Sequence, residues 1–119
     1  MSRNRASAKA AGARFERTMA DYFKAQLSEF IDRRVKTGAK DKGDLVNVRA
    51  HGQEVVVELK DCAKFDIGGW INEADVERGN ADALAGLVIF KRRGTTDPGD
   101  MYALMTVRDL LAIWQGARP

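Results

Sequence analysis

The sequence is poor in the residue types on which several common protein chemistries depend. Among its 119 residues there is one cysteine, Cys62, and one histidine, His51. A single cysteine excludes an internal disulfide bond and argues against a structural zinc site, and a single histidine argues against a histidine-rich metal site. We therefore expect Cys62 to be a small buried thiol and His51 to be a solvated loop residue.

Long apolar runs and nucleotide-binding motifs are missing as well. No stretch approaches the ~18 to 20 apolar residues that span a bilayer, and the first residues lack the apolar segment of a secretory signal. There is no phosphate-binding P-loop, dinucleotide fingerprint or convincing Ser/His/Asp triad. We expect a cytoplasmic protein of one compact domain, with no membrane partner and no small-molecule cofactor.

Charge of one sign is not in large excess, but the basic residues are clustered. The net charge of +3 comes from 20 basic and 17 acidic side chains. Residues 1–17 and 33–43 carry most of the clustered basic groups, and such groups attract phosphates. We expect residues 1–11 to be a flexible basic arm before a single domain, residues 12–119. The predicted DNA-binding residues are Arg3, Arg5, Lys9, Arg14, Arg33, Arg34, Lys36, Lys40 and Lys42.

Two charged residues lie inside a valine-rich run that predicts a buried strand, residues 54–60. Because side chains alternate along a strand, Glu58 and Lys60 project from one face about 6 to 7 Å apart, while Leu59 points into the core. Charges buried on such a strand are costly without a compensating ion. Two carboxylates and an ammonium group therefore indicate a metal-dependent phosphodiesterase site, with Asp44 as the second acid.

The position of Asp44 depends on the hairpin that joins its strand to the valine-rich strand. A two-residue turn at His51 and Gly52 would place Asp44 opposite Leu59, on the wrong face. A three-residue loop that ends at Gly52 would place it opposite Glu58, where the two acids can share a cation. We predict the three-residue loop, because glycine adopts positive φ at little cost.

An amphipathic helix is predicted over residues 13–30, with apolar residues from Phe15 to Phe30 at helical spacing. Glu16 lies at the border of its apolar face. It could pair with Arg17 or Lys24 at the rim of the core, or it could supply a further carboxylate to the metal site.

The remaining pattern predicts an edge strand (34–36), a loop (62–69), a helix capped by Asn72 and ending near Leu84, strands over 87–90 and 101–105, and a final helix through Trp114. The apolar face of that helix contains Val107, Leu110, Leu111 and Trp114. We expect Trp70 and Trp114 to pack in the core or in a subunit interface. The order α-β-β-β-α-β-β-α predicts an α/β fold with a mixed sheet of about five strands flanked by helices.

These segments, taken in order, resemble the PD-(D/E)xK nuclease superfamily, and most closely the archaeal-type Holliday junction resolvases. The resemblance lies in residues 12–17, 34–38, 42–46 and 55–60, followed by a helix and the strand 87–90. It implies a restriction-endonuclease-like core. The chain departs from the pattern at Gly43, where the name of the superfamily has proline.

The resemblance also implies roles for individual residues. Asp44, Glu58 and the Leu59 carbonyl would bind Mg²⁺ or Mn²⁺, Lys60 would orient the attacking water, and Glu16 would complete the site as a further catalytic acid. Thr37 lies where such resolvases often have a small hydroxyl residue near the phosphate, which adds it to the predicted DNA-binding residues.

The predicted function is that of a magnesium-dependent endodeoxyribonuclease, a Holliday junction resolvase acting in recombination. Paired cuts in two strands would require a homodimer, and the resemblance implies a prokaryotic or phage-infected host. The alternatives are a restriction- or repair-type nuclease of the same superfamily and a non-catalytic DNA-binding module.

Overall fold

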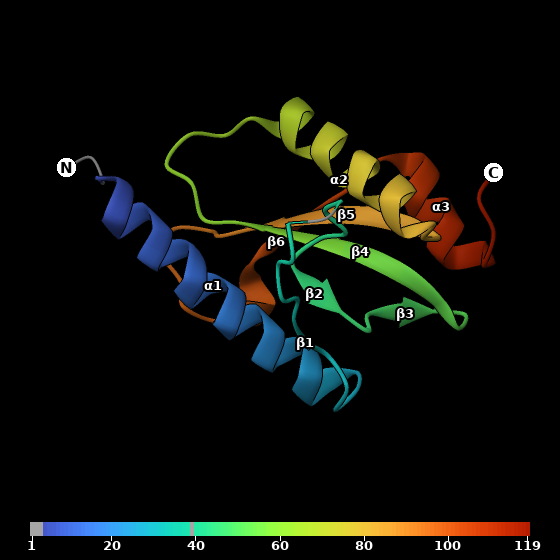
Figure 1. The fold of residues 1–119 in the computed structure, drawn as a ribbon, viewed down its shortest axis with the longest axis horizontal. Helices are drawn as coiled ribbons and strands as arrows, with labels where there is room; N and C mark the ends of the chain where they lie inside the picture. The colour runs from blue at the N-terminus through green and yellow to red at the C-terminus, as the bar shows by residue number, and fades with distance from the viewer. Residues whose placement is uncertain (1–3, 39) are drawn as a thin grey trace.

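Strand β4 (Gln53–Lys60) forms the centre of the fold, as its run of valines predicts. The computed structural model describes residues 4–38 and 40–119 and has an α/β fold (Figure 1). The other elements, in order, are α1 (Arg5–Gln26), β1 (Asp32–Arg33), β2 (Leu45–Val46), β3 (Arg49–Ala50), α2 (Ile67–Ala81), β5 (Ala85–Phe90), the 3-10 turn η1 (Pro98–Asp100), β6 (Tyr102–Leu104) and α3 (Val107–Gln115).

The strands form a mixed sheet of four, in the order β3-β4-β5-β6, and a separate antiparallel pair, β1-β2. Strands β4 and β5 run parallel, and the other pairs are antiparallel. The predicted α/β class is confirmed, although the strands are divided between two sheets instead of forming one sheet of about five.

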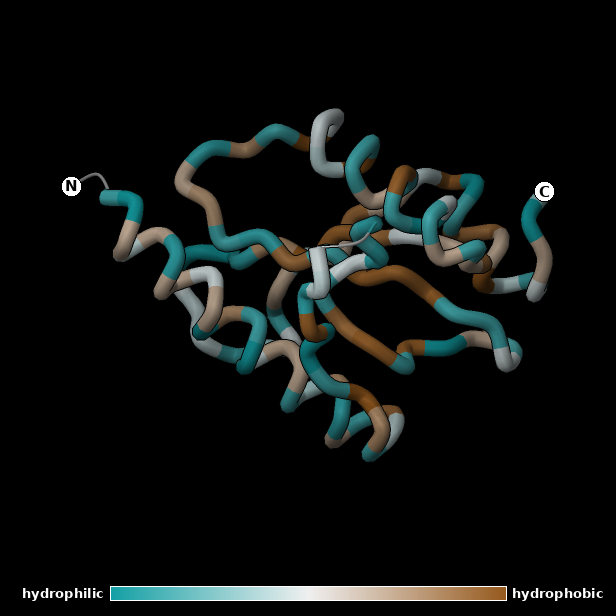
Figure 2. The backbone as a smooth tube through the Cα atoms, viewed as in Figure 1, coloured by the Kyte–Doolittle hydropathy of each residue, from teal (hydrophilic) through white to brown (hydrophobic). Residues whose placement is uncertain are grey.

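The two faces of β4 are covered by different helices. Val55, Val57 and Leu59 pack in one core cluster with apolar side chains of α1, whereas Lys60, on the opposite face, contacts α2. Figure 1 shows α1 and α2 on opposite sides of the sheet, and Figure 2 shows that the most hydrophobic segments are β4 and β5 between them. Leu59 therefore lies in the core, as predicted, while its charged neighbours face α2.

Helix α1 begins earlier and ends earlier than the predicted 13–30. Asn4 caps it by accepting a hydrogen bond from the Ser7 amide, and the following alanine-rich sequence has high helix propensity. The expected arm without regular structure is therefore wrong for residues 5–11, where Ala11 is buried. At the other end, Leu27 and Phe30 follow the last turn and are exposed instead of continuing the apolar face.

The predicted three-residue hairpin loop is also wrong. Ala50 pairs with Gln53 across a two-residue turn, in which His51 and Gly52 both have positive φ (53° and 71°). This is the geometry of a type I′ turn, whose twist matches that of the two strands. His51 is exposed, as expected, and its Nε2 lies 2.7 Å from the Ile113 carbonyl oxygen.

The strand predicted to run from Asp44 is interrupted at Asn47, which has a φ of 65°. The Asn47 side chain donates a hydrogen bond to the Phe30 carbonyl, 2.8 Å away. The residues before this break, β2, pair with β1, and only those after it, β3, belong to the hairpin with β4, so the register of the hairpin does not extend to Asp44. The edge strand is Asp32–Arg33 and not the predicted 34–36, and Val35 is exposed.

Helix α2 also begins before its predicted start. Asp66 caps it by accepting from the Gly69 amide, so the Gly68-Gly69 pair lies in the first turn and not in a loop. The helix approaches β5 closely, because a Cβ atom at Gly86 would lie 2.9 Å from the Ala74 carbonyl oxygen. Cys62, expected to be buried, is exposed.

Helix α3 is confirmed, with Thr106 as its N-cap. The buried carboxylate of Asp109 accepts from the Gly86 amide (2.9 Å) and from Arg118 (3.0 Å), which fixes the helix to β5. Trp70 is buried, as predicted, but Trp114 is 70% exposed and does not pack in the core. Every helix in the described part of the chain is too short or too polar to span a bilayer.

Candidate metal centre

Glu58 and Lys60 project from β4 toward α2, as their alternation along the strand predicts. The Lys60 Nζ lies 3.6 Å from Glu58 Oε2 and 2.8 Å from Glu73 Oε1 on α2. Glu58 is 4% exposed, and its Oε1 has no hydrogen-bond partner. A buried carboxylate with an unpartnered oxygen is costly and can accept either a proton or a cation.

Asp44 reaches the same region from the edge of the sheet. Its amide donates to the Val57 carbonyl (2.9 Å), and its Oδ2 accepts from the Leu59 amide (2.8 Å). The preceding residue, Gly43, has a φ of 96°, and a Cβ atom there would lie 2.8 Å from Val56 Cγ1. Proline, with φ fixed near −65°, could not adopt this conformation. The departure from the superfamily pattern at Gly43 therefore has a structural reason.

The Leu59 carbonyl faces the side of Asp44. The N–H and C=O groups of one strand residue point to the same edge, and the Leu59 amide donates to Asp44. Its neighbour Lys60 bonds in the other direction, through its carbonyl to Lys91 on the β5 side. The carbonyl predicted as a metal ligand is thus directed toward the predicted metal-binding acid.

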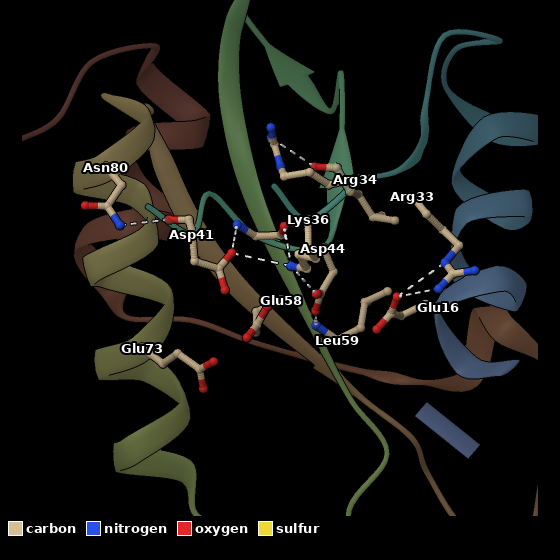
Figure 3. A network of polar contacts seen from close by, with 12 residues as sticks. Glu16, Arg33, Arg34, Lys36, Asp41, Asp44, Glu58, Leu59, Glu73 and Asn80 are labelled. Carbon is tan, nitrogen blue, oxygen red and sulfur yellow. Dashed lines mark hydrogen bonds and ion pairs between the residues drawn. The ribbon is translucent and has the colours of Figure 1, made fainter. Parts of the chain in front are cut away.

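Lys36 joins the loop before Asp44 to the site. Its Nζ lies 3.0 Å from Asp44 Oδ1, 3.0 Å from the Gly43 carbonyl oxygen and 3.4 Å from Asp41 Oδ1. The Asn80 side chain donates to the Asp41 carbonyl (2.8 Å), which ties this loop to α2 (Figure 3). An ammonium group surrounded by three oxygens shows that this position favours a cation.

The structure adds two acids that the sequence analysis did not select, Glu73 and Glu77 on α2. One carboxylate oxygen from each of Glu58, Glu73 and Glu77 lies within 4.8 Å of the others. The two α2 residues are separated by one helical turn and therefore share a face. This i,i+4 spacing was a signal in the sequence, but the predicted start of the helix at Asn72 gave no reason to orient that face toward β4.

We refer to Asp41, Asp44, Glu58, Glu73 and Glu77 as the acidic cluster. Burial, followed by the nearby carboxylates of Asp44 and Glu73, raises the pKa of Glu58 from 4.5 to about 12. Burial and the charge of Asp41 raise the pKa of Glu77 from 4.5 to about 8. Both groups therefore carry protons at neutral pH unless another cation replaces them.

The two lysines of the site remain charged. Burial alone would lower the pKa of Lys60, but its hydrogen bond to Glu73 and the charge of that carboxylate oppose burial, and the pKa is raised. Burial likewise opposes the charge on Lys36, and the hydrogen bond to Asp44 reverses this and raises the pKa. The acidic cluster thus contains five acids but is contacted by only two lysines, an excess of three acidic groups.

Glu16 is not brought into the acidic cluster. Its Oε1 lies 3.1 Å from the Arg33 guanidinium, and among the described residues it forms no ion pair with Arg17 or Lys24, its two predicted partners. Figure 3 shows Glu16 on the α1 side, with Leu59 between it and Glu58. In this structure the residue forms an ion pair at the rim of an open groove.

That groove has a volume of about 760 Å³ and lies between α1 and the chain around β1. Its basic lining residues are Lys9, Arg17, Arg33, Arg34 and Lys36. Arg34 is held within the fold by Glu54 (2.8 Å) and the Leu45 carbonyl (3.3 Å). The other predicted DNA-binding residues that are described, Arg5, Arg14, Thr37, Lys40 and Lys42, are exposed, and Arg3 lies outside the described residues.

The chain matches no family model, no curated protein and no solved structure.

Proposed function

We propose that the protein is a metal-dependent endonuclease that hydrolyses phosphodiester bonds in DNA. The observation that supports this most strongly is that two buried acids lie close together, Glu58 beside the Lys60 ammonium (3.6 Å) and Asp44 beside the Lys36 ammonium (3.0 Å). Asp44 is 7% exposed and Glu58 4%. Burial of two carboxylates at the edge of a sheet is expected where a divalent cation compensates their charge.

The donor set fits Mg²⁺ or Mn²⁺. Asp44, Glu58 and the Leu59 carbonyl offer only oxygen ligands, which these hard cations prefer. A bound divalent cation supplies Lewis-acid polarisation of the phosphate and lowers the pKa of a coordinated water. In this proposal Lys60 would orient that water, and the hydrogen bond from the Leu59 amide would keep Asp44 in position.

The groove beside α1 supports DNA as the substrate. Lys9, Arg17 and Arg33 line it, and Lys36 is shared between the groove and the acidic cluster. The basic side chains of the groove would attract the phosphates of DNA and offset their repulsion by the carboxylates of the acidic cluster, so that a phosphate could reach the metal site.

Branched DNA and a homodimer form the narrower part of the proposal. The resemblance to junction resolvases favours a four-way junction and a restriction-endonuclease-like core. Two-fold symmetry would pair two sites for symmetric cuts. An exposed apolar surface on α3, formed by Val107, Leu111 and Trp114, supports self-association.

The test is cleavage of labelled four-way junction, linear duplex and single-stranded DNA in the presence of Mg²⁺. Asp44→Asn and Glu58→Gln should each reduce cleavage by about 100-fold or more, whereas Asp75→Asn, an exposed acid on α2, should not. Symmetric nicks at the junction support the resolvase, and broad duplex cutting supports a restriction- or repair-type enzyme. DNA binding without metal-dependent cleavage would overturn the proposed activity and leave a binding module.

A further inference from the structure

Two acids of the acidic cluster, Glu73 and Glu77 on α2, have no role in the proposed hydrolysis. One of them, Glu77, is nevertheless the most buried acid of the cluster. Glu77 is 2% exposed, and neither carboxylate oxygen has a hydrogen-bond partner. Native proteins rarely leave a buried polar group in this state. The group requires either a proton or a cation that is not part of the chain.

The charges around Glu77 are of the same sign. Asp41, Glu73 and Asp44 all act on it as neighbouring negative charges, and without a metal ion the Asp41 carboxylate is close enough to share a proton with Glu77. Lys36 contacts Asp41 and Asp44, and Lys60 contacts Glu58 and Glu73. In the part of the chain that the structure describes, no ion pair includes Glu77.

The geometry is suited to one hard divalent cation. Oxygens from Glu58, Glu73 and Glu77 all lie within 4.8 Å of one another. Opposite oxygen ligands are separated by about 4.0–4.2 Å around Mg²⁺ and by about 4.6–5.2 Å around Ca²⁺. Three carboxylates at this spacing can therefore contact a single cation after small side-chain adjustments.

We propose that Glu73 and Glu77, together with Glu58, form a second divalent-cation site next to the one assigned to Asp44. Glu58 then serves both positions, and the buried oxygens of Glu77 gain a partner. This inference goes beyond the proposed function, since it requires no DNA and no hydrolysis. It shares only Glu58 with the proposed nuclease site.

A cation at this position would change the contacts of Lys60. The Lys60 ammonium is 2.8 Å from Glu73 and 3.6 Å from Glu58. Binding of Glu73 to a divalent cation removes the closer of these two partners. The second site would then control whether Lys60 is held against α2 or is available at the edge of the sheet.

The experiment is a calorimetric titration of metal-free protein with Mn²⁺, without DNA. The wild type should bind two Mn²⁺ ions, and Glu73→Gln and Glu77→Gln should each weaken one of them by about tenfold or more. Asp44→Asn should weaken the other ion and retain the α2 site. Asp75→Asn is the matched control, because Asp75 lies on the same helix but is exposed.

A second measurement locates the ion. In Asp44→Asn protein, Mn²⁺ should broaden the NMR signals of backbone amides around residues 73–77, and this effect should disappear in the Asp44→Asn, Glu77→Gln double variant. Glu73 is partly exposed, so Glu73→Gln remains a folded test if Glu77→Gln does not fold. Wild-type Mn²⁺ binding in both α2 variants would overturn the inference, even if DNA is cleaved. If the wild type binds Mn²⁺ at Glu73 and Glu77 but does not cleave DNA, only the proposed function would be overturned.

Discussion

The Leu59 amide donates a hydrogen bond of 2.8 Å to the Asp44 carboxylate. This contact holds Asp44 at the edge of β4, next to Leu59, the residue before Lys60. The β3-β4 hairpin itself has the two-residue turn that, if its register continued, would place Asp44 opposite Leu59 and away from Glu58. The break at Asn47 uncouples Asp44 from that hairpin. Asp44 is therefore held beside Glu58 by two contacts with β4, the side-chain cap on the Leu59 amide and the backbone hydrogen bond to the Val57 carbonyl, and not by the register of the hairpin.

Gly43→Ala should destabilise the protein and the site. The added Cβ would meet Val56 Cγ1 at 2.8 Å and the Val57 carbonyl at 3.1 Å, in a residue with positive φ. We expect a loss of about 2–3 kcal/mol in the free energy of unfolding, measured by urea denaturation. Gly52→Ala is the control, because Gly52 also has positive φ but has no atom within 4 Å of the added Cβ, and it should cost only about 1 kcal/mol. Equal losses in both variants would show that backbone strain alone, without the contact, accounts for the effect.

The stability of the metal-free protein should fall as the pH rises from about 4.5 to about 8. Over this range Glu77 ionises in the unfolded chain but stays protonated in the folded protein, because its pKa rises from 4.5 to about 8. The folded state therefore binds more protons, and the free energy of unfolding decreases with pH. Glu58 acts in the same direction, with its pKa raised to about 12.

Thermal denaturation between pH 5 and pH 8, in the presence of a chelator, measures this effect. The slope should become shallower in Glu77→Gln protein, and saturating Mn²⁺ should stabilise the wild type more at pH 8 than at pH 5, because the cation replaces protons. A melting temperature that rises over this range would contradict the assignment of buried, protonated glutamates.

Lys36→Met should strengthen Mn²⁺ binding at Asp44 and weaken DNA binding. The Lys36 ammonium lies 3.0 Å from Asp44 Oδ1 and competes with a metal ion for that carboxylate. Removal of one screened unit charge at this distance corresponds to about 1 kcal/mol, or roughly fivefold in affinity. Calorimetry and a DNA-binding titration check the two effects. Lys42→Met, which removes an exposed lysine from the same loop, should leave Mn²⁺ affinity unchanged.

Glu16→Gln should leave Mn²⁺ affinity unchanged and reduce stability by less than about 1 kcal/mol. The reason is that Glu16 pairs with Arg33 across a partly exposed groove, away from the acidic cluster. Loss of a Mn²⁺ ion in this variant, measured by calorimetry, would show that Glu16 moves into the site when metal binds. That outcome would support the ligand role implied by the resemblance.

Trp114→Ser should reduce self-association. Trp114 and Val107 are 70% and 71% exposed on α3, and large exposed apolar side chains of this kind are typical of interfaces. Sedimentation equilibrium of the wild type should show a dimer, and the variant should shift toward monomer. Val35→Ser, which removes an apolar side chain that is 81% exposed elsewhere, is the control. A monomeric wild type would exclude this role for α3.

The parts of the fold that follow from local pattern could be predicted. The valine run of β4, the apolar strand β5 and the Thr106-capped α3 each carry their signal within a few residues. For the same reason, the common orientation of Glu58 and Lys60 could be predicted from strand alternation alone.

Features set by distant contacts could not be predicted in this way. The positive φ of Asn47 accompanies a hydrogen bond to Phe30, and Arg33 is the partner of Glu16 because β1 packs against α1. The missed acids of α2 depend on the Asp66 cap and on how the helix is seated over β4. The Asp66 cap has a local signal, an acid three residues before Gly69, but the contacts of Asn47 and Glu16 and the seating of the helix have none in the residues next to them.

The seating of α2 depends on Gly86, where a Cβ atom would be only 2.9 Å from the Ala74 carbonyl oxygen. One missing methyl group thus sets how far Glu73 and Glu77 of α2 stand above Glu58 on β4. A substitution at this uncharged position would widen that gap and change the size of ion that fits the proposed second site. The ionic selectivity of the proposed site would therefore be adjustable without altering any of its proposed ligands.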